Sequence, residues 1–232
     1  MNIARVLSRL LPFIGRADGD QPARRYNIIV KELSARHRRR LLRHFLALGP
    51  DDRLLRFGGQ LPDELVRRYV EGLDFRRDQI FGVFDPGFRL VGVAHLAFIP
   101  IDQRALYSHS TTREKVAEFG VSVSATARGL GIGTRLFQRA VIHCRNADVD
   151  TLYMHCLSSN KTMMHIAVKA GMKIERSYGE ADAYLKLPPA SPGSVLQEAM
   201  DEQLARFDYT FKSNSRRAAR WLGYWPGKHE KK

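Results

Sequence analysis

The chain contains little cysteine and no long apolar run. Its two cysteines, Cys144 and Cys156, lack the paired Cys/His spacing that a zinc site or a redox dithiol needs, so we expect reduced, buried thiols and no bound metal. No apolar stretch approaches the roughly 20 residues that cross a bilayer, and the N-terminal stretch lacks the long apolar run and cleavage site of a secretory signal. The sequence therefore predicts a cytoplasmic protein without a transmembrane segment.

Acidic residues are also scarce, since 24 Asp and Glu stand against 38 Lys and Arg and leave a formal net charge of +14. The excess is mostly N-terminal, with 11 basic and 3 acidic residues among residues 1–50. Such a surface could attract nucleic acid, an acidic protein, anionic lipid or cofactor phosphates, or it could simply solubilise the protein. Arginines accompany aromatic residues at 216–225, but no recognised nucleic-acid motif is present, so nucleic acid is not the partner that we expect.

The length of 232 residues and the 44% apolar content allow one well-cored domain with extra length at both ends. We predict a basic N-terminal extension over residues 1–25, a domain over 26–187 and a C-terminal tail over 188–232 with a helix at 195–220. The N-terminal extension could form a basic amphipathic helix or a frayed end. The run PPASPGS after Leu187 breaks regular structure and marks the start of the tail.

Inside the domain, periodicity and turn residues predict alternating strands and helices. Asp85-Pro86-Gly87 predicts an antiparallel hairpin, and two strand–helix units in succession imply a parallel strand pair. Gly49-Pro50 is expected to end a helix and to be followed by a turn. The predicted helices span residues 35–48, 62–73, 131–146 and 160–170, and the predicted strands span 27–33, 79–84, 89–98, 115–123, 151–156, 172–178 and 181–187.

Glycines gather where the strand at 115–123 gives way to a helix. Arg128, Gly131 and Gly133 form the pattern R-x-x-G-x-G at this junction. Glycines let backbone N–H groups approach a ligand, and the helix N-terminus adds about half a positive charge, so a pyrophosphate would suit the site. The alternative is a tight turn without a ligand, because a lone glycine pattern is weak.

This pattern resembles the cofactor-binding motif Q/R-x-x-G-x-G/A of the GNAT superfamily of N-acetyltransferases. A second stretch, TLYMHCLSSNKTMMHIAVKAGM, is similar to the companion motif of that family, with Asn160, Lys169 and Gly171 in register. The phrase AEFGVSVSATARGLGIG looks closest to the branch that includes protein-lysine acetyltransferases. The resemblance implies a mixed α/β, GNAT-like fold: a mostly antiparallel central sheet with a splayed parallel strand pair, flanked by helices.

The resemblance also implies acetyl-CoA as cosubstrate and assigns residues to it. Edge groups of Val121 and Val123 would meet the pantetheine arm, and the side-chain amide of Asn160, which both donates and accepts hydrogen bonds, would bind the same arm. Backbone N–H groups of the glycine-rich loop would hold the pyrophosphate. The loop residues are Arg128, Gly129, Leu130, Gly131, Ile132, Gly133 and Thr134.

The implied reaction is acetyl transfer to a primary amine of a small molecule or a protein lysine. Glu118 is the expected general base, although it could instead pair with a cation such as Lys115. Where the family usually has a tyrosine as general acid this chain has Ala167, but a thiol of pKa about 8.5 can leave without full protonation. The alternative function is a catalytically impaired acetyl-CoA sensor. The positive net charge favours acidic acceptors, while the acceptor itself and the oligomeric state are left open.

Overall fold

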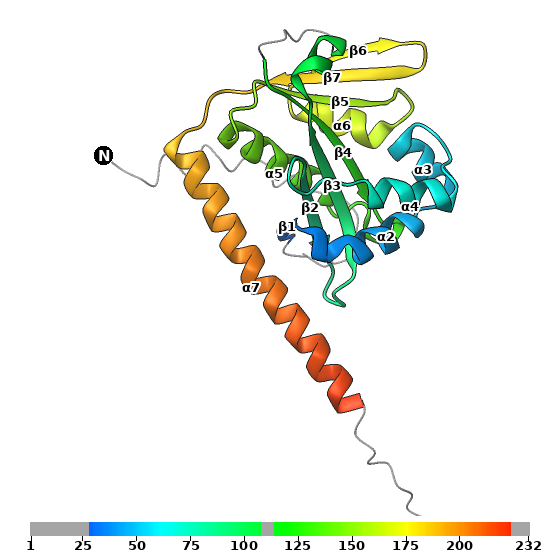
Figure 1. Cartoon of the computed structure of the whole chain (residues 1–232), viewed down its shortest axis with the longest axis vertical. Coiled ribbons are helices and arrows are strands. Elements are labelled where there is room, and N and C mark those ends of the chain that lie inside the picture. The colour runs from blue at the N-terminus through cyan, green and yellow to red at the C-terminus, as the bar shows by residue number, and fades with distance from the viewer. Residues whose placement is uncertain (1–27, 108–113, 224–232) are drawn as a thin grey trace, which may run out of the picture.

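The computed structural model describes residues 28–107 and 114–223 and is built around a seven-stranded sheet with the order β1-β2-β3-β4-β5-β7-β6 (Figure 1). All neighbouring strands are antiparallel except β4 and β5, which are parallel. This confirms the predicted fold class. The strands are β1 (Val30–Leu33), β2 (Gln79–Phe84), β3 (Leu90–Phe98), β4 (Val116–Val123), β5 (Thr151–Leu157), β6 (Lys173–Ser177) and β7 (Glu180–Lys186).

The parallel pair is short. Strands β4 and β5 pair from Val116 opposite Thr151 to Glu118 opposite Tyr153, whereas β4 continues to pair with β3 as far as Val123. Beyond Glu118 the two parallel strands therefore diverge. The edge of β4 that faces β5 is left without a strand partner there, and its backbone groups can pair with something else.

Helices cover both faces of the sheet, with α2, α3 and α4 on one side and α5 and α7 on the other (Figure 1). The described helices are η1 (Ala35–His37), α2 (Arg38–Leu46), α3 (Pro50–Phe57), α4 (Asp63–Glu71), η2 (Ile101–Leu106), η3 (Ala125–Ala127), α5 (Ile132–Asn146), α6 (Lys161–Lys169) and α7 (Pro192–Gly223). The expected N-terminal helix lies outside the described residues, as do the side chains from residue 219 onward.

Successive residues of β4 serve opposite faces of the sheet, because the side-chain period of a strand is two. Phe119 packs edge-on against Phe137 of α5, with ring centroids 5.2 Å apart. On the other face, the hydroxyl of Ser122 lies 2.8 Å from Nε2 of His44 in α2. Glu118, two positions before Gly120 and four before Ser122, therefore belongs to the face covered by α2, α3 and α4.

Helix α3 corrects the expectation of a turn after Gly49-Pro50. Pro50 occupies the first turn with Asp51 and Asp52, and Gly58 ends the helix with φ of 72°. Proline and acidic residues at the start and a left-handed glycine at the end are ordinary helix signals. The segment of only eight residues between two glycine-containing breaks looked like a turn because it is too short to show clear periodicity.

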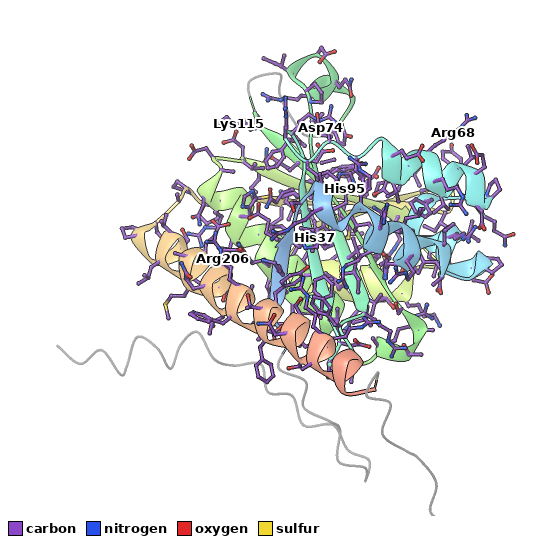
Figure 2. The ribbon with its side chains drawn as sticks, turned by 60° about the horizontal axis from the view of Figure 1, so that its bottom comes forward. His37, Arg68, Asp74, His95, Lys115 and Arg206 are labelled. Carbon is purple, nitrogen blue, oxygen red and sulfur yellow. The ribbon has the colours of Figure 1, made fainter. Side chains whose placement is uncertain are left out.

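Helix α7 packs on β1 and α5 and begins at Pro192, three residues before the predicted start. Glu198 of α7 lies 2.7 Å from Nη1 of Arg139 and 2.8 Å from Nδ1 of His143, both on α5. Further along, the hydroxyl of Tyr209 lies 3.2 Å from Nε2 of His37. Figure 2 shows His37 inside the folded body beneath α7, which carries Arg206. Helix α7 is thus tied to the domain around Glu198 and again around Tyr209.

Among the described residues, no helix is long and apolar enough to cross a membrane, and no cluster of His, Cys, Asp and Glu side chains could hold a metal ion. Cys144 and Cys156 are free and buried, as expected. Burial raises the pKa of both thiols, so they are unreactive members of the core.

Candidate active site

A cleft of about 610 Å³ lies between the second half of β4, the N-terminus of α5, and helices α3 and α6. Its volume is within the usual range of ligand sites. Of the predicted cofactor-binding residues, Leu130 packs toward the core, and the others line the cleft together. These are Val121, Val123, Arg128, Gly129, Gly131, Ile132, Gly133, Thr134 and Asn160.

The glycine-rich loop presents backbone amides to this cleft. Gly129 and Gly131 have φ of 75° and 79°, a left-handed conformation that favours glycine, and Gly131 is the N-cap of α5. No side chain caps this helix, and within the described part of the chain no hydrogen-bond partner is found for the N–H groups of residues 129–134. A helix N-terminus with open amides fits a phosphate group.

Packing of α5 against α6 explains the third glycine. A Cβ added to Gly133 would lie 3.2 Å from Cδ1 of Ile166, so glycine at this position lets the two helices approach closely. At Gly129 and Gly131, by contrast, an added Cβ would meet nothing within 4 Å. Glycine is required at positions 129 and 131 by the left-handed backbone conformation. At position 133 glycine is favoured because a side chain would crowd Ile166.

Helix α3 forms the opposite wall of the cleft, although the sequence did not predict it as a helix. Asp52 lines the cleft and forms an ion pair with Arg128 of the glycine-rich loop. Arg53 instead donates hydrogen bonds to the carbonyl groups of Leu48 and Leu61, at 3.1 and 2.7 Å. Asp52 is therefore part of the cleft wall, whereas Arg53 binds backbone groups on both sides of α3.

Asn160 connects two walls of the cleft. Its Oδ1 accepts from the N–H of Met163 at 3.1 Å and caps α6, while Nδ2 donates to the carbonyl of Leu55 in α3 at 3.3 Å. The side chain is buried. An amide has a second N–H and a second lone pair, so capacity for a ligand remains after these two bonds.

Glu118 lies where β4 and β5 diverge. Its Oε2 accepts a hydrogen bond of 3.0 Å from the phenol of Tyr107, and within the described residues it forms no ion pair with Lys115 or an arginine. Burial and the adjacent carboxylate raise the pKa of Tyr107, which keeps the phenol protonated as a donor. Tyr107 packs edge-on against Tyr153, with centroids 4.9 Å apart. Tyr107 was not predicted, because it follows η2 in a segment without periodicity.

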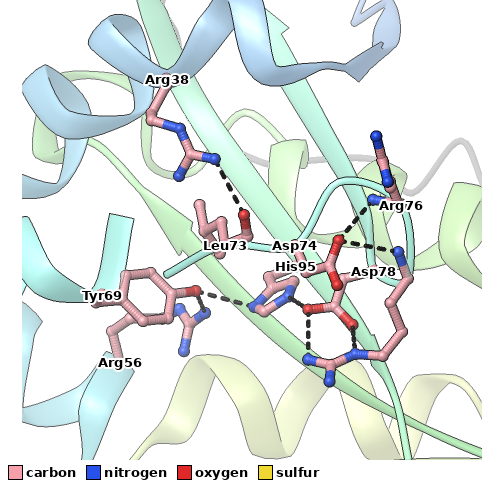
Figure 3. Close-up of polar contacts among 9 residues, drawn as sticks. Arg38, Arg56, Tyr69, Leu73, Asp74, Arg76, Asp78 and His95 are labelled. Atoms are coloured by element: carbon pink, nitrogen blue, oxygen red, sulfur yellow. Dashed lines mark hydrogen bonds and ion pairs between the residues drawn. The ribbon is translucent and has the colours of Figure 1, made fainter. Parts of the chain in front are cut away.

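A series of hydrogen-bonded polar side chains lies on the same face of the sheet and begins at a cleft residue, Arg56 (Figure 3). Nη2 of Arg56 donates to the hydroxyl of Tyr69 at 2.9 Å, this hydroxyl lies 3.0 Å from Nδ1 of His95, and Nε2 of His95 lies 3.1 Å from Oδ2 of Asp78. Burial would raise the pKa of Asp78, but hydrogen bonds from His95 and Arg77 lower it, so the carboxylate is ionised.

Which group donates in each of these hydrogen bonds follows from the donor and acceptor capacity of the side chains. A carboxylate only accepts, so Nε2–H of His95 donates to Asp78. In a neutral ring Nδ1 then accepts from the hydroxyl of Tyr69, whose oxygen accepts from Arg56. The sequence did not predict this hydrogen-bonded series, because its residues come from α3, α4, β3 and the loop before β2 and no local pattern links them.

At Ala167 the helix α6 carries a buried methyl group, 1% exposed, within the main core. Its methyl group cannot donate a proton to a leaving thiolate. His165, on another face of α6, is exposed and lines the cleft. The position at which the family usually has a tyrosine is therefore filled by a small core residue here.

The model of the acetyltransferase (GNAT) family matches residues 51–172, more than half of the chain. The chain belongs to the GNAT acetyltransferase family. It is a GNAT-type acyltransferase, as the resemblance implied. The matched segment runs from α3 through α6 and contains the glycine-rich loop, Glu118 and Asn160. No curated protein matches the sequence.

Solved structures of other GNAT proteins share the fold. The GNAT domain of S. lividans PAT has a TM-score of 0.56 at 18% identity, over 68% of this chain and 89% of that chain. Ribosomal-protein-alanine N-acetyltransferase from Brucella melitensis has a TM-score of 0.51 at 16% identity, over 69% of this chain and 100% of that chain. Spermidine N-acetyltransferase from Vibrio cholerae, in complex with CoA and spermine, has a TM-score of 0.50 at 19% identity, over 68% of this chain and 94% of that chain. At such identities the likeness concerns the fold alone.

Proposed function

We propose that this GNAT protein transfers the acetyl group of acetyl-CoA to a primary amine, on a small molecule or a protein, by direct attack of the amine. The observation that carries the proposal is that open amides at the start of α5 and the carboxylate of Glu118 are joined by the unpaired edge of β4. A cofactor extended along that edge would have its phosphates at one end and its reactive group near a base.

Bound acetyl-CoA would supply an activated acetyl thioester. The amides of residues 128–134 would hold its pyrophosphate, and the edge groups of Val121 and Val123 would pair with its pantetheine arm. Asn160 would add hydrogen bonds from the capacity that its capping role leaves free. Holding both reactants in one cleft supplies much of the rate, because effective concentrations in such sites are high.

Glu118 would accept the proton of the attacking amine, directly or through a water molecule. Tyr107 would fix one oxygen of this carboxylate, leaving Oε1 for the amine. With Ala167 in place of a phenol, the thiolate would leave without a dedicated acid from α6, which a thiol permits more readily than an alcohol.

The alternative is a protein that binds acetyl-CoA and acts as a sensor without efficient turnover, and Ala167 is what favours it. We further propose that the acetyltransferase domain spans residues 26–187, that the protein acts in the cytoplasm, and that nucleic acid is not its main partner. An assay of acetyl-CoA consumption with a panel of amines separates enzyme from sensor.

A matched pair of substitutions tests the phosphate site. Asn and Asp have nearly the same shape and both tolerate the left-handed conformation of Gly131, whereas only Asp adds a negative charge. We expect Gly131→Asn to retain most of the affinity for acetyl-CoA and Gly131→Asp to lose about tenfold or more, measured by calorimetric titration. Equal affinity in the two variants, or no binding by the wild type, would contradict the proposed cofactor site.

A further inference from the structure

Arg56 lies over β4 two residues beyond the candidate base Glu118. A Cβ added to Gly120 would come within 2.9 Å of Cζ, Nη1 and Nη2 of Arg56, so all three atoms rest against the strand backbone where Gly120 has no side chain. Residues 118 and 120 point to the same face of β4. The guanidinium and the carboxylate of Glu118 are therefore neighbours along one face of the strand.

Among the described residues no acidic side chain is in direct contact with Arg56, although the carboxylate of Glu118 lies nearby along the strand. Within the described residues it forms no ion pair, and its polar partner is the phenol of Tyr69. Its guanidinium lies 5.1 Å from the ring centre of Phe57 and 6.0 Å from that of Phe45, and its buried Nε has no hydrogen-bond partner in the part of the chain that the structure describes. Aromatic faces attract a cation, but they do not neutralise it. Partly buried charges are normally paired, so this one is available to an anion.

The surroundings hold Arg56 in position without cancelling its charge. Burial raises the pKa of Tyr69, so this residue stays a neutral phenol. The chain from Tyr69 through His95 to Asp78 turns the phenol oxygen toward Arg56 as an acceptor. Arg56 also lines the cleft, on the wall formed by α3. A fixed, unpaired guanidinium at the wall of a cleft is suited to a carboxylate, which it can bind with two parallel hydrogen bonds.

We propose that Arg56 binds a carboxylate of the acceptor, and hence that the preferred acceptor is an amine that carries a carboxylate, of the size of an amino acid. This inference rests on the proposed function. Positions 118 and 120 are about 7 Å apart along the strand, so one small acceptor can place its amine at Glu118 and its carboxylate at Arg56. The positive net charge of the protein would attract such an acceptor.

The cofactor phosphates are the competing anion, and the geometry disfavours them. Open amides of residues 129–134 lie beyond Val123, at least three residues or about 10 Å along β4 from Gly120. Arg128, which belongs to that end of the cleft, is already paired with Asp52. The phosphate end and the Arg56 end of the cleft are thus separate.

The test compares amino acids with their carboxamides as acetyl acceptors. Each pair shares the amine and differs at the carboxylate, and the carboxamide has the less basic amine, so amine reactivity alone would favour the amide. For the wild type we expect kcat/KM about tenfold higher for the acid. Arg56→Gln should abolish this preference by raising KM for the acids. Arg56→Lys keeps the positive charge but lacks the two parallel N–H donors of the guanidinium, and it should retain part of the preference.

Arg43→Gln on the exposed surface of α2 is the matched control for the loss of one positive charge and should keep the preference. Thermal unfolding checks that each variant is folded, and calorimetry checks that Arg56→Gln binds acetyl-CoA as the wild type does. If amides are acetylated as well as acids, or if Arg56→Gln weakens acetyl-CoA binding, the carboxylate subsite is wrong while the acetyltransferase function stands. Acetylation of no amine would overturn both.

Discussion

At the scale of single residues, Glu118 and Tyr107 have different expected roles and should respond differently to substitution. Glu118→Gln keeps the shape of the side chain but removes the base, so we expect kcat to fall by about 100-fold or more. Tyr107→Phe removes the 3.0 Å hydrogen bond that orients the carboxylate, and a loss of about tenfold is expected. Steady-state kinetics with an amine that the wild type acetylates measures both losses of activity.

Affinity for acetyl-CoA should be unchanged in both variants, because neither side chain is among the residues proposed to hold the cofactor, which are the glycine-rich loop, Val121, Val123 and Asn160. Calorimetric titration provides this control. Full activity of Glu118→Gln with unchanged binding would show that the base is elsewhere, and His165, which lines the cleft from α6, would be the next candidate.

Residues with a local signature could be predicted, and residues assembled by topology could not. Gly131 and Gly133 stand at the start of a helix in a recognisable spacing; glycine is required at 131 by its left-handed backbone conformation and favoured at 133 by the packing of α5 on α6. Tyr107 and Arg56 reach the site only because β4 pairs with β3 and α3 crosses the strand face. Nothing in a single sequence indicates that an arginine from α3 will lie against Gly120.

At the scale of elements, helix α5 and the hairpin were predicted nearly to the residue, α7 was predicted three residues short at each end, and α3 was missed. Helix α5 and the hairpin at Asp85 show full periodicity and turn chemistry, so local preference and tertiary structure agree. Helix α3 has eight residues, none of them fully buried, and lies between two glycine-containing breaks, so its length alone did not favour a helix over a turn. Its position matters more than its length, because it forms one wall of the candidate active site.

Docking of α7 on the domain makes a prediction at this scale. Burial would raise the pKa of Glu198, but hydrogen bonds from His143, Arg139 and Asn146 lower it to about 2. The side chain of Arg139 is only 3% exposed. Glu198→Gln would leave this buried cation without its counter-ion, and we expect the free energy of unfolding to fall by about 3 kcal/mol, measured by chemical denaturation.

Arg206→Gln is the matched control on the same helix. It removes an exposed ion pair with Glu202 at 3.2 Å, and surface pairs of this kind contribute at most about 1 kcal/mol. A change of similar size in the two variants would indicate that α7 is not held by the buried cluster around Glu198.

At the scale of the whole molecule, two buried histidines link α2, the sheet and α7, and both are neutral in the fold. Nδ1 of His37 accepts from the N–H of Ser34 at 3.0 Å, and Nδ1–H of His44 donates to the carbonyl of Leu90 at 3.2 Å. Burial lowers the pKa of each from 6.5 to about 4, with nearby arginines adding to the effect. Protonation of His37 would set two donors, its own Nδ1–H and the N–H of Ser34, against each other.

The dependence of stability on pH follows from these two shifts. As pH falls below 6.5 the unfolded chain takes up protons that the folded protein does not, so stability is complete above pH 6.5 and is lost progressively down to pH 4. Each histidine accounts for about 3 kcal/mol over this range. Chemical denaturation at a series of pH values should show this slope before the carboxylates titrate, and replacing both histidines by glutamine should flatten it. A stability that stays constant from pH 7 to 4 would mean that the histidines take up protons as readily in the folded protein as in the unfolded chain, so that their pKa values are not lowered by the fold.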